Sequence, residues 1–144
     1  MIILDTNVVS EPMKPRGDPA VQVWLDDQLA ESLYLTATSL SELLLGIELL
    51  PDGQRKDGLA VALTELLEHL FGPRILPFDE RAAAAFAPLI RRTRAAGQTL
   101  SVADAQIAAI AMVHGFSVAT RDTAPFAAAG VPIINPWNTE GPTS

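Results

Sequence analysis

Short apolar runs alternate with longer segments in which apolar residues recur every three or four positions. The short runs predict buried strands at residues 1–4, 32–36, 74–78, 116–120 and 131–134. Helical spacing predicts helices at residues 19–29, 38–50, 59–71, 80–96, 102–114 and 123–129. Because strands and helices alternate, we expect an α/β fold in which helices cover both faces of a central parallel sheet.

Turn and capping residues separate these elements. Ser101 is a suitable helix N-cap, and Asp104 three residues later stands at the capping-box position. Ser39 and Glu42 form an S-x-x-E capping box of the same spacing, which predicts that a helix begins there. Polar segments rich in proline or glycine, at 11–17 and 51–58, are predicted loops.

Composition narrows the class of protein. The 144 residues are enough for one domain, 1–144, with a flexible tail at about 138–144. No apolar run reaches the roughly 20 residues of a membrane span, and no signal peptide is recognisable. The chain has no cysteine, which excludes disulfides and thiol catalysis. We therefore expect a cytoplasmic protein without membrane contact. Its net charge of −7 argues against binding phosphate through a broadly basic surface.

Four acidic residues are expected at one edge of the predicted sheet. Asp5 and Asp122 each follow a strand, whereas Glu42 and Asp104 each lie in the first turn of a predicted helix. A helix that runs antiparallel to the next strand begins level with that strand's carboxyl end, where ligands of open α/β sheets bind. Any one of these acids is explained by helix capping alone.

The convergence of all four favours a metal site. Clustered carboxylates repel one another unless a cation lies among them, and an all-oxygen set points to Mg²⁺ or Mn²⁺. Such ions support phosphodiester hydrolysis. Asn7 and Thr120 flank the expected site and are candidates to orient a water or a phosphate, and Arg121 lies beside it.

The arginines at 91, 92 and 94 form the one dense basic cluster. The simpler interpretation is a solvated helix end near the negative pole of the helix dipole. The alternative is contact with the phosphate groups of a ligand, in which Arg121 would also take part.

The sequence lacks the motifs of other phosphate-binding sites and of serine hydrolases. There is no Walker P-loop and no G-x-S-x-G elbow. His69 and His114 lie on predicted helices without a partnered serine. A phospho-aspartate site needs a catalytic lysine, whereas Lys14 and Lys56 lie in polar loops.

The segments LDTNVVSE, SELLLGIELL, ADAQIAAIA and VATRD resemble those of PIN-domain proteins. Their spacing is similar to that of VapC toxins of bacterial type II toxin–antitoxin systems, and ILPFDERAAAAFA and NPW resemble the FitB-like subgroup. The resemblance implies a three-layer sandwich and Mg²⁺- or Mn²⁺-dependent endoribonuclease cleavage of single-stranded RNA. It assigns the catalytic and metal-binding quartet to Asp5, Glu42, Asp104 and Asp122, with Asn7 and Thr120 in support.

The resemblance also implies partners. These are a cognate antitoxin that is basic and binds DNA, and a second copy of the chain in a homodimer. An alternative function stays open at this point. In the FitB-like subgroup the chain can serve as a regulatory subunit that reaches DNA only through its antitoxin, with little or no nuclease activity.

Overall fold

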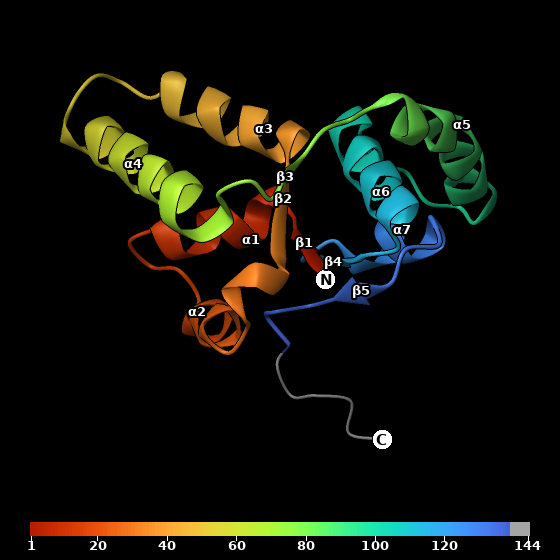
Figure 1. Ribbon diagram of the computed structural model, residues 1–144, viewed down its shortest axis with the longest axis horizontal. Helices are drawn as coiled ribbons and strands as arrows, with labels where there is room; N and C mark the ends of the chain where they lie inside the picture. The colour runs from red at the N-terminus through yellow and green to blue at the C-terminus, as the bar shows by residue number, and fades with distance from the viewer. Residues whose placement is uncertain (139–144) are drawn as a thin grey trace.

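A computed structural model describes residues 1–138 and shows a parallel sheet between two groups of helices (Figure 1). The strands are β1 (Ile2–Leu4), β2 (Leu33–Thr36), β3 (Ile75–Leu76), β4 (Ser117–Ala119) and β5 (Ile133–Ile134). They form one five-stranded sheet in the order β3-β2-β1-β4-β5, with every neighbouring pair parallel. The expected α/β fold is confirmed.

The helices connect successive strands. They are α1 (Thr6–Ser10), α2 (Pro19–Asp26), α3 (Ala37–Glu48), α4 (Gln54–Glu65), α5 (Glu80–Ala95), α6 (Val102–His114) and α7 (Thr123–Ala128). Two 3-10 segments, η1 (Glu11–Met13) and η2 (Ala30–Ser32), and a π-helical turn, η3 (Leu66–Phe71), complete the path. In the described residues, no helix is long and apolar enough to cross a membrane.

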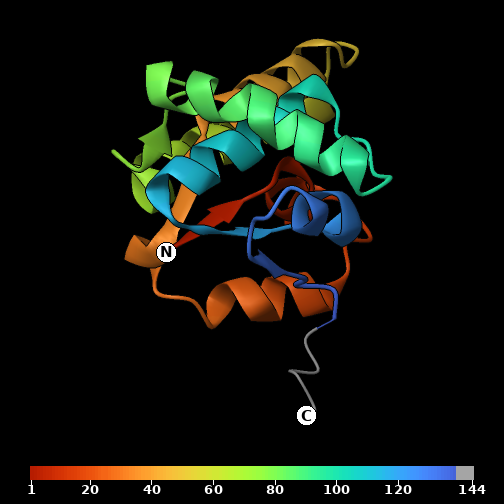
Figure 2. The same ribbon diagram turned by 90° about the vertical axis from the view of Figure 1, so that its right-hand side faces the viewer.

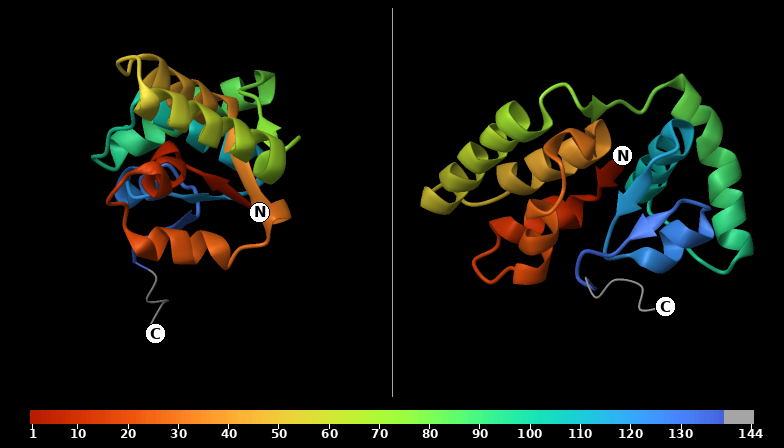
Figure 3. Two further views of the ribbon diagram at one scale, coloured as in Figure 1. Left: turned by 90° about the vertical axis from the view of Figure 1, so that its left-hand side faces the viewer. Right: turned by 60° about the horizontal axis from the view of Figure 1, so that its bottom comes forward.

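The sheet separates two hydrophobic cores because its side chains alternate between faces. Ile3 and Val118 point into a core with residues of α5, α6 and α7, which lie together on one side (Figure 2). Leu4 and Leu35 point into the other core, which residues of α1, α2, α3 and α4 share. The left panel of Figure 3 shows α1 in the middle, with α2 below it and the α3–α4 pair above it.

The central position of β1 determines where the acidic residues meet. Its neighbours are β2 and β4, with Ile2 opposite both Leu33 and Ser117. Because the three strands are parallel, their carboxyl ends lie at one edge, where the chain passes into α1, α3 and the segment before α7. The helix α6 packs on α3 and precedes β4, so its first turn reaches the same edge.

Several element boundaries differ from those predicted. The helix α4 begins at Gln54, inside the predicted loop at 51–58. Its first turn is polar and exposed, so it lacks the apolar period on which the prediction relied, although its residues form helices readily. The predicted loop at 11–17 starts with a 3-10 turn, and the strand predicted at 74–78 shortens to β3. The predicted tail falls almost entirely on 139–144, outside the described residues.

Candidate active site at the carboxyl edge of the sheet

Asp5 ends the central strand and is the most buried of the four acids, with 3% of its surface exposed. Its Oδ1 accepts a hydrogen bond from the backbone N–H of Thr6 at 2.8 Å, so Asp5 caps α1. Its Oδ2 accepts from the hydroxyl of Thr120, also at 2.8 Å. Burial raises the pKa of Asp5 to about 6 despite these donors, and the negative charges of Asp104 and Glu42 act in the same direction.

Glu42 is not the capping glutamate that the S-x-x-E pattern predicted. The cap of α3 is Thr36, whose Oγ1 accepts from the backbone N–H of Ser39 at 3.0 Å, so the helix begins earlier. Glu42 therefore lies in the second turn of α3, exposed to solvent. Its Oε1 accepts a hydrogen bond from the hydroxyl of Thr6 at 2.7 Å. A contact between α1 and α3 positions Glu42.

Asp104 lies in the first turn of α6, where the backbone N–H of Asp104 donates to Ser101 Oγ at 3.1 Å. The predicted N-cap at Ser101 is confirmed. Half-burial raises the pKa of the Asp104 carboxyl, and the negative charges of Glu42 and Asp122 raise it further. The electrostatic contacts of Asp5 and Asp104 thus include every member of the quartet.

Thr120 connects two of these acids. Its hydroxyl donates to Asp5, and its oxygen accepts from the backbone N–H of Asp122 at 3.0 Å. Asp122 is exposed and precedes α7, and its side chain makes no capping bond to that helix. Its carboxylate is therefore available at the edge.

Asn7 and Arg121 differ in their surroundings. The Oδ1 atom of Asn7, in the first turn of α1, is buried and has no hydrogen-bond partner among the described residues. A buried acceptor without a partner is costly unless a water or ligand satisfies it. Arg121 is exposed, and its guanidinium lies 5.2 Å from the ring centre of Trp137, so it packs on that ring.

The α5 arginines are not equivalent. Arg92 donates from Nε to the carbonyl oxygen of Ala129 at 3.0 Å and contacts the sulfur of Met112, so it fastens α5 to the neighbouring elements. All three arginines are exposed, but the side chains of Arg91 and Arg94 make no hydrogen bond with the described residues. Hydrogen bonding therefore distinguishes Arg92, which holds α5 to its neighbours, from Arg91 and Arg94.

The quartet carries negative charge without a cation of its own. The ion pairs in the part of the chain that the structure describes are Lys14–Glu11 and Lys56–Asp52, and His69 lies 4.0 Å from Glu68; none of these contacts includes a member of the quartet. Among the same residues, no group of three or more His, Cys, Asp or Glu side chains is gathered closely enough to hold a metal ion. The acids lie at one edge of the sheet, and their negative charges raise the pKa of Asp5 and of Asp104. Their side chains nevertheless do not converge on one point.

The donor chemistry nevertheless suits a hard divalent cation. All four acids offer oxygen ligands, which Mg²⁺ and Mn²⁺ prefer. Each oxygen of Asp5 accepts one hydrogen bond and keeps a further lone pair. The unpartnered Oδ1 of Asn7 adds a neutral acceptor in the turn that follows Asp5.

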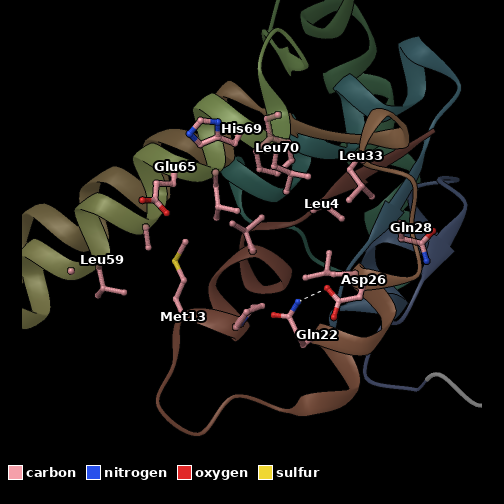
Figure 4. A pocket seen from close by; sticks show the side chains of 18 residues that line it. Leu4, Met13, Gln22, Asp26, Gln28, Leu33, Leu59, Glu65, His69 and Leu70 are labelled. Carbon is pink, nitrogen blue, oxygen red and sulfur yellow. Dashed lines mark hydrogen bonds between the residues drawn. The ribbon is translucent and has the colours of Figure 1, made fainter.

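Two hollows lie on the side of the sheet that α1 and α4 cover. The larger, about 860 Å³, is lined mainly by apolar residues of η1, α2, α4 and η3, and none of the quartet lines it (Figure 4). The smaller, about 280 Å³, begins at the acidic edge itself, where Thr6 and Glu42 form part of its wall. A ligand in the smaller hollow would lie against one member of the quartet.

Thr6 is a site residue that the sequence analysis missed. A threonine after a capping aspartate has an ordinary local explanation, and its bond to Glu42 spans 36 residues. Nothing in the sequence near Thr6 signals that contact.

Comparison with known proteins agrees with the architecture. The sequence model of the family described as PIN domain matches residues 2–131. The chain is 48% identical to VapC ribonuclease Y4jK of Sinorhizobium fredii, over 95% of this chain and 98% of the relative. It is 45% identical to Toxin FitB of Neisseria gonorrhoeae, over 96% and 99% of the two chains. A solved structure, FitAB bound to an IR36 DNA fragment, superposes with a TM-score of 0.87 at 44% identity and covers 97% of this chain and 98% of its own.

Proposed function

The chain belongs to the PIN domain family, and we propose that it is a metal-dependent endoribonuclease that cleaves single-stranded RNA as the toxin of a toxin–antitoxin pair. The observation that carries this proposal is the environment of Asp5. The carboxyl is buried at the end of the central strand, its pKa is raised, and Asp104 and Glu42 contribute to that shift. The names of the relatives, a VapC ribonuclease and a toxin, support the same function.

In this proposal Asp5, Glu42, Asp104 and Asp122 hold Mg²⁺ or Mn²⁺. Such an ion supplies Lewis acidity, which offsets the negative charge that develops on a phosphodiester during hydrolysis. The side chains would have to converge by rotation, which Asp122 can do at small cost because it is exposed and its side chain makes no capping bond.

The remaining polar residues have orienting roles. Thr120 fixes the Asp5 carboxylate and, through its oxygen, the backbone at Asp122. Asn7 offers its buried Oδ1 to a water or to a hydroxyl of the substrate. Arg91, Arg94 and Arg121 are candidate phosphate contacts, because they are exposed cations in an acidic chain. Arg92, already bonded to Ala129, is a weaker candidate.

The proposed partner is a small basic antitoxin that binds DNA. The net charge of −7 favours such a partner, and the related FitAB structure is a complex bound to DNA. The same relative supports a second candidate function, in which this chain is mainly the regulatory subunit of a DNA-bound complex. Homodimer formation stays a prediction.

Cleavage of RNA by the purified chain tests the first function against the second. We expect single-stranded RNA to be cut with Mg²⁺ or Mn²⁺ and to be left intact with EDTA. Asp5→Asn should reduce the rate at least about a hundredfold, by the size of effect usual for a lost electrostatic group. Asp79→Asn is the matched control, because Asp79 also caps a helix but lies at the start of α5.

The outcomes separate the two functions. Equal cleavage by the wild type and Asp5→Asn would show that a contaminant or another site is responsible, and the nuclease proposal would fail. No cleavage by either, under conditions in which the antitoxin complex binds DNA, would favour the regulatory function.

A further inference from the structure

The smaller hollow is a groove that leads away from the acidic edge along α3. Thr6, Ser10 and Met13 form one wall, and Glu42, Gly46 and Ile47 form the other. Leu43, Leu50 and Leu59 supply apolar surface, and two cations, Lys14 and Arg55, border it. We call this hollow the α3 groove. Its volume of about 280 Å³ is close to the lower limit of small-ligand sites, roughly 300 Å³.

Gly46 shows that the groove is kept open. This residue lies inside α3 and is exposed, and a Cβ atom built on it would meet no atom within 4 Å. Glycine inside a helix costs about 1 kcal/mol relative to alanine. Packing within the described residues does not require glycine here, and without a side chain at this position the groove stays open along this face of α3. Gly46 follows Glu42 by one helical turn, and the open space therefore continues from the acidic edge.

Charge indicates what enters the groove. The side chain of Arg55 is exposed and makes no hydrogen bond or ion pair with any of residues 1–138, whereas Lys14 Nζ lies 3.4 Å from Glu11 Oε2. Both cations border the same groove in a chain whose net charge is −7. A groove with an apolar wall and cations at its border matches a nucleotide, which has an apolar base face and an anionic phosphate.

We propose that the α3 groove binds one nucleotide of single-stranded RNA, next to the phosphodiester that lies at the acidic edge. The base packs on the apolar wall beside Gly46, and the phosphate of that nucleotide lies near Arg55. This inference rests on the proposed ribonuclease function for the identity of its ligand, but binding to the groove can be measured without cleavage.

The test compares RNA affinity among variants, by fluorescence anisotropy with a labelled single-stranded RNA in Ca²⁺. Gly46→Leu fills the groove and should weaken binding about tenfold, because the base can no longer bury its face against the apolar wall. Gly58→Leu is its control, because Gly58 is also helical with open space at Cβ but lines the larger hollow. Gly46→Ala, which improves helix propensity and fills little space, should bind nearly as the wild type does.

Arg55 is tested in the same way. Arg55→Gln should weaken binding several-fold and lower the slope of log Kd against log salt by about one. Arg16→Gln is the control, because Arg16 is an exposed cation of the neighbouring loop that does not line the groove. A larger effect of Arg55 than of Arg16 is the expected result.

The outcomes distinguish this inference from the proposed function. One outcome is that cleavage requires Asp5 while Gly46→Leu and Arg55→Gln bind RNA as the wild type does. That result would overturn the proposal that the α3 groove binds RNA and would leave the proposed ribonuclease function standing. A second outcome is RNA binding that depends on Gly46 and Arg55 in a chain that does not cleave RNA. That result would support RNA binding in the α3 groove and would contradict the proposed nuclease function. Unchanged RNA affinity with lost antitoxin binding in Gly46→Leu would assign the groove to a protein partner and overturn the inference.

Discussion

The hydroxyl of Thr6 donates to Glu42 Oε1 at 2.7 Å, while the backbone N–H of Thr6 donates to Asp5 Oδ1 at 2.8 Å. One residue therefore holds two carboxylates of the candidate site, one from β1 and one from α3. Because Glu42 is exposed and its side chain is long, this bond restricts a side chain that would otherwise sample many rotamers.

Removal of the Thr6 hydroxyl should weaken metal binding. We expect Thr6→Val to raise the Kd for Mn²⁺ about tenfold, in the range found when groups that orient metal ligands are lost. Thr6→Ser keeps the hydroxyl and should bind Mn²⁺ nearly as the wild type does. Isothermal titration calorimetry measures both. Equal affinities in the Val and Ser variants would show that the bond does not position Glu42.

Asp5 should make the protein less stable as the pH rises. The pKa of its carboxyl is 3.8 when unperturbed and about 6 in the folded chain, so the folded state holds the proton more tightly. The stabilisation is complete below pH 3.8 and is lost as the pH rises through 6. Asp5→Asn removes this loss and should be more stable than the wild type at pH 7.5 without metal, by up to about 3 kcal/mol.

Urea denaturation from pH 4 to pH 7.5 in EDTA checks this dependence. The difference in the free energy of unfolding between Asp5→Asn and the wild type should widen with pH. Asp18→Asn, a substitution at the cap of α2, controls for replacing any capping aspartate. A constant difference across the range would contradict the raised pKa. Added Mn²⁺ should stabilise the wild type and leave Asp5→Asn nearly unchanged.

Substitutions of Asp104 and Asp122 should differ in their effect on stability, although both should weaken metal binding. Asp104 is half-buried with a raised pKa, so Asp104→Asn should stabilise the metal-free protein at neutral pH. Asp122 is exposed, so Asp122→Asn should change the free energy of unfolding by less than about 0.5 kcal/mol. Both variants should bind Mn²⁺ more weakly. Unchanged Mn²⁺ affinity in both would remove these two acids from the proposed metal site.

The α5 arginines should behave differently from one another. Arg92→Ala loses the bond to Ala129 and should reduce stability by about 1 kcal/mol. Arg91→Ala and Arg94→Ala should leave stability unchanged and, if they contact RNA, each should lower the salt dependence of RNA binding by about one phosphate contact. Thermal unfolding and binding at several salt concentrations measure these effects. An unchanged slope of log Kd against log salt would show that Arg91 and Arg94 belong to a solvated helix face and do not contact RNA.

Local patterns predicted the fold well because most element boundaries have local causes. Asp79 and Ser101 cap their helices through their own side chains, and Gly115 ends α6 in the left-handed conformation at φ 69°. The start of α3 was predicted wrongly because a threonine three residues earlier could serve the same purpose as Ser39. Only the structure decides which hydroxyl accepts the bond.

The candidate site was predictable in part. Asp5, Glu42, Asp104 and Asp122 follow strands or open helices, and parallel strands bring such positions to one edge. Their mutual electrostatic contacts agree with that expectation, whereas the spacing needed to hold a metal ion is not reached in the described residues. The Thr6–Glu42 bond and the α3 groove depend on contacts between distant segments, which no local pattern encodes.

The pairing of β1 with β4 also has a consequence for synthesis on the ribosome. Ile2 lies opposite Ser117, and the Thr120–Asp5 bond joins residues 115 positions apart. A nascent chain that ends before β4 lacks one of the two neighbours of β1, the Thr120 hydroxyl that bonds Asp5, and one of the four acids, Asp122. The acidic edge is therefore complete only when nearly the whole polypeptide has left the ribosome.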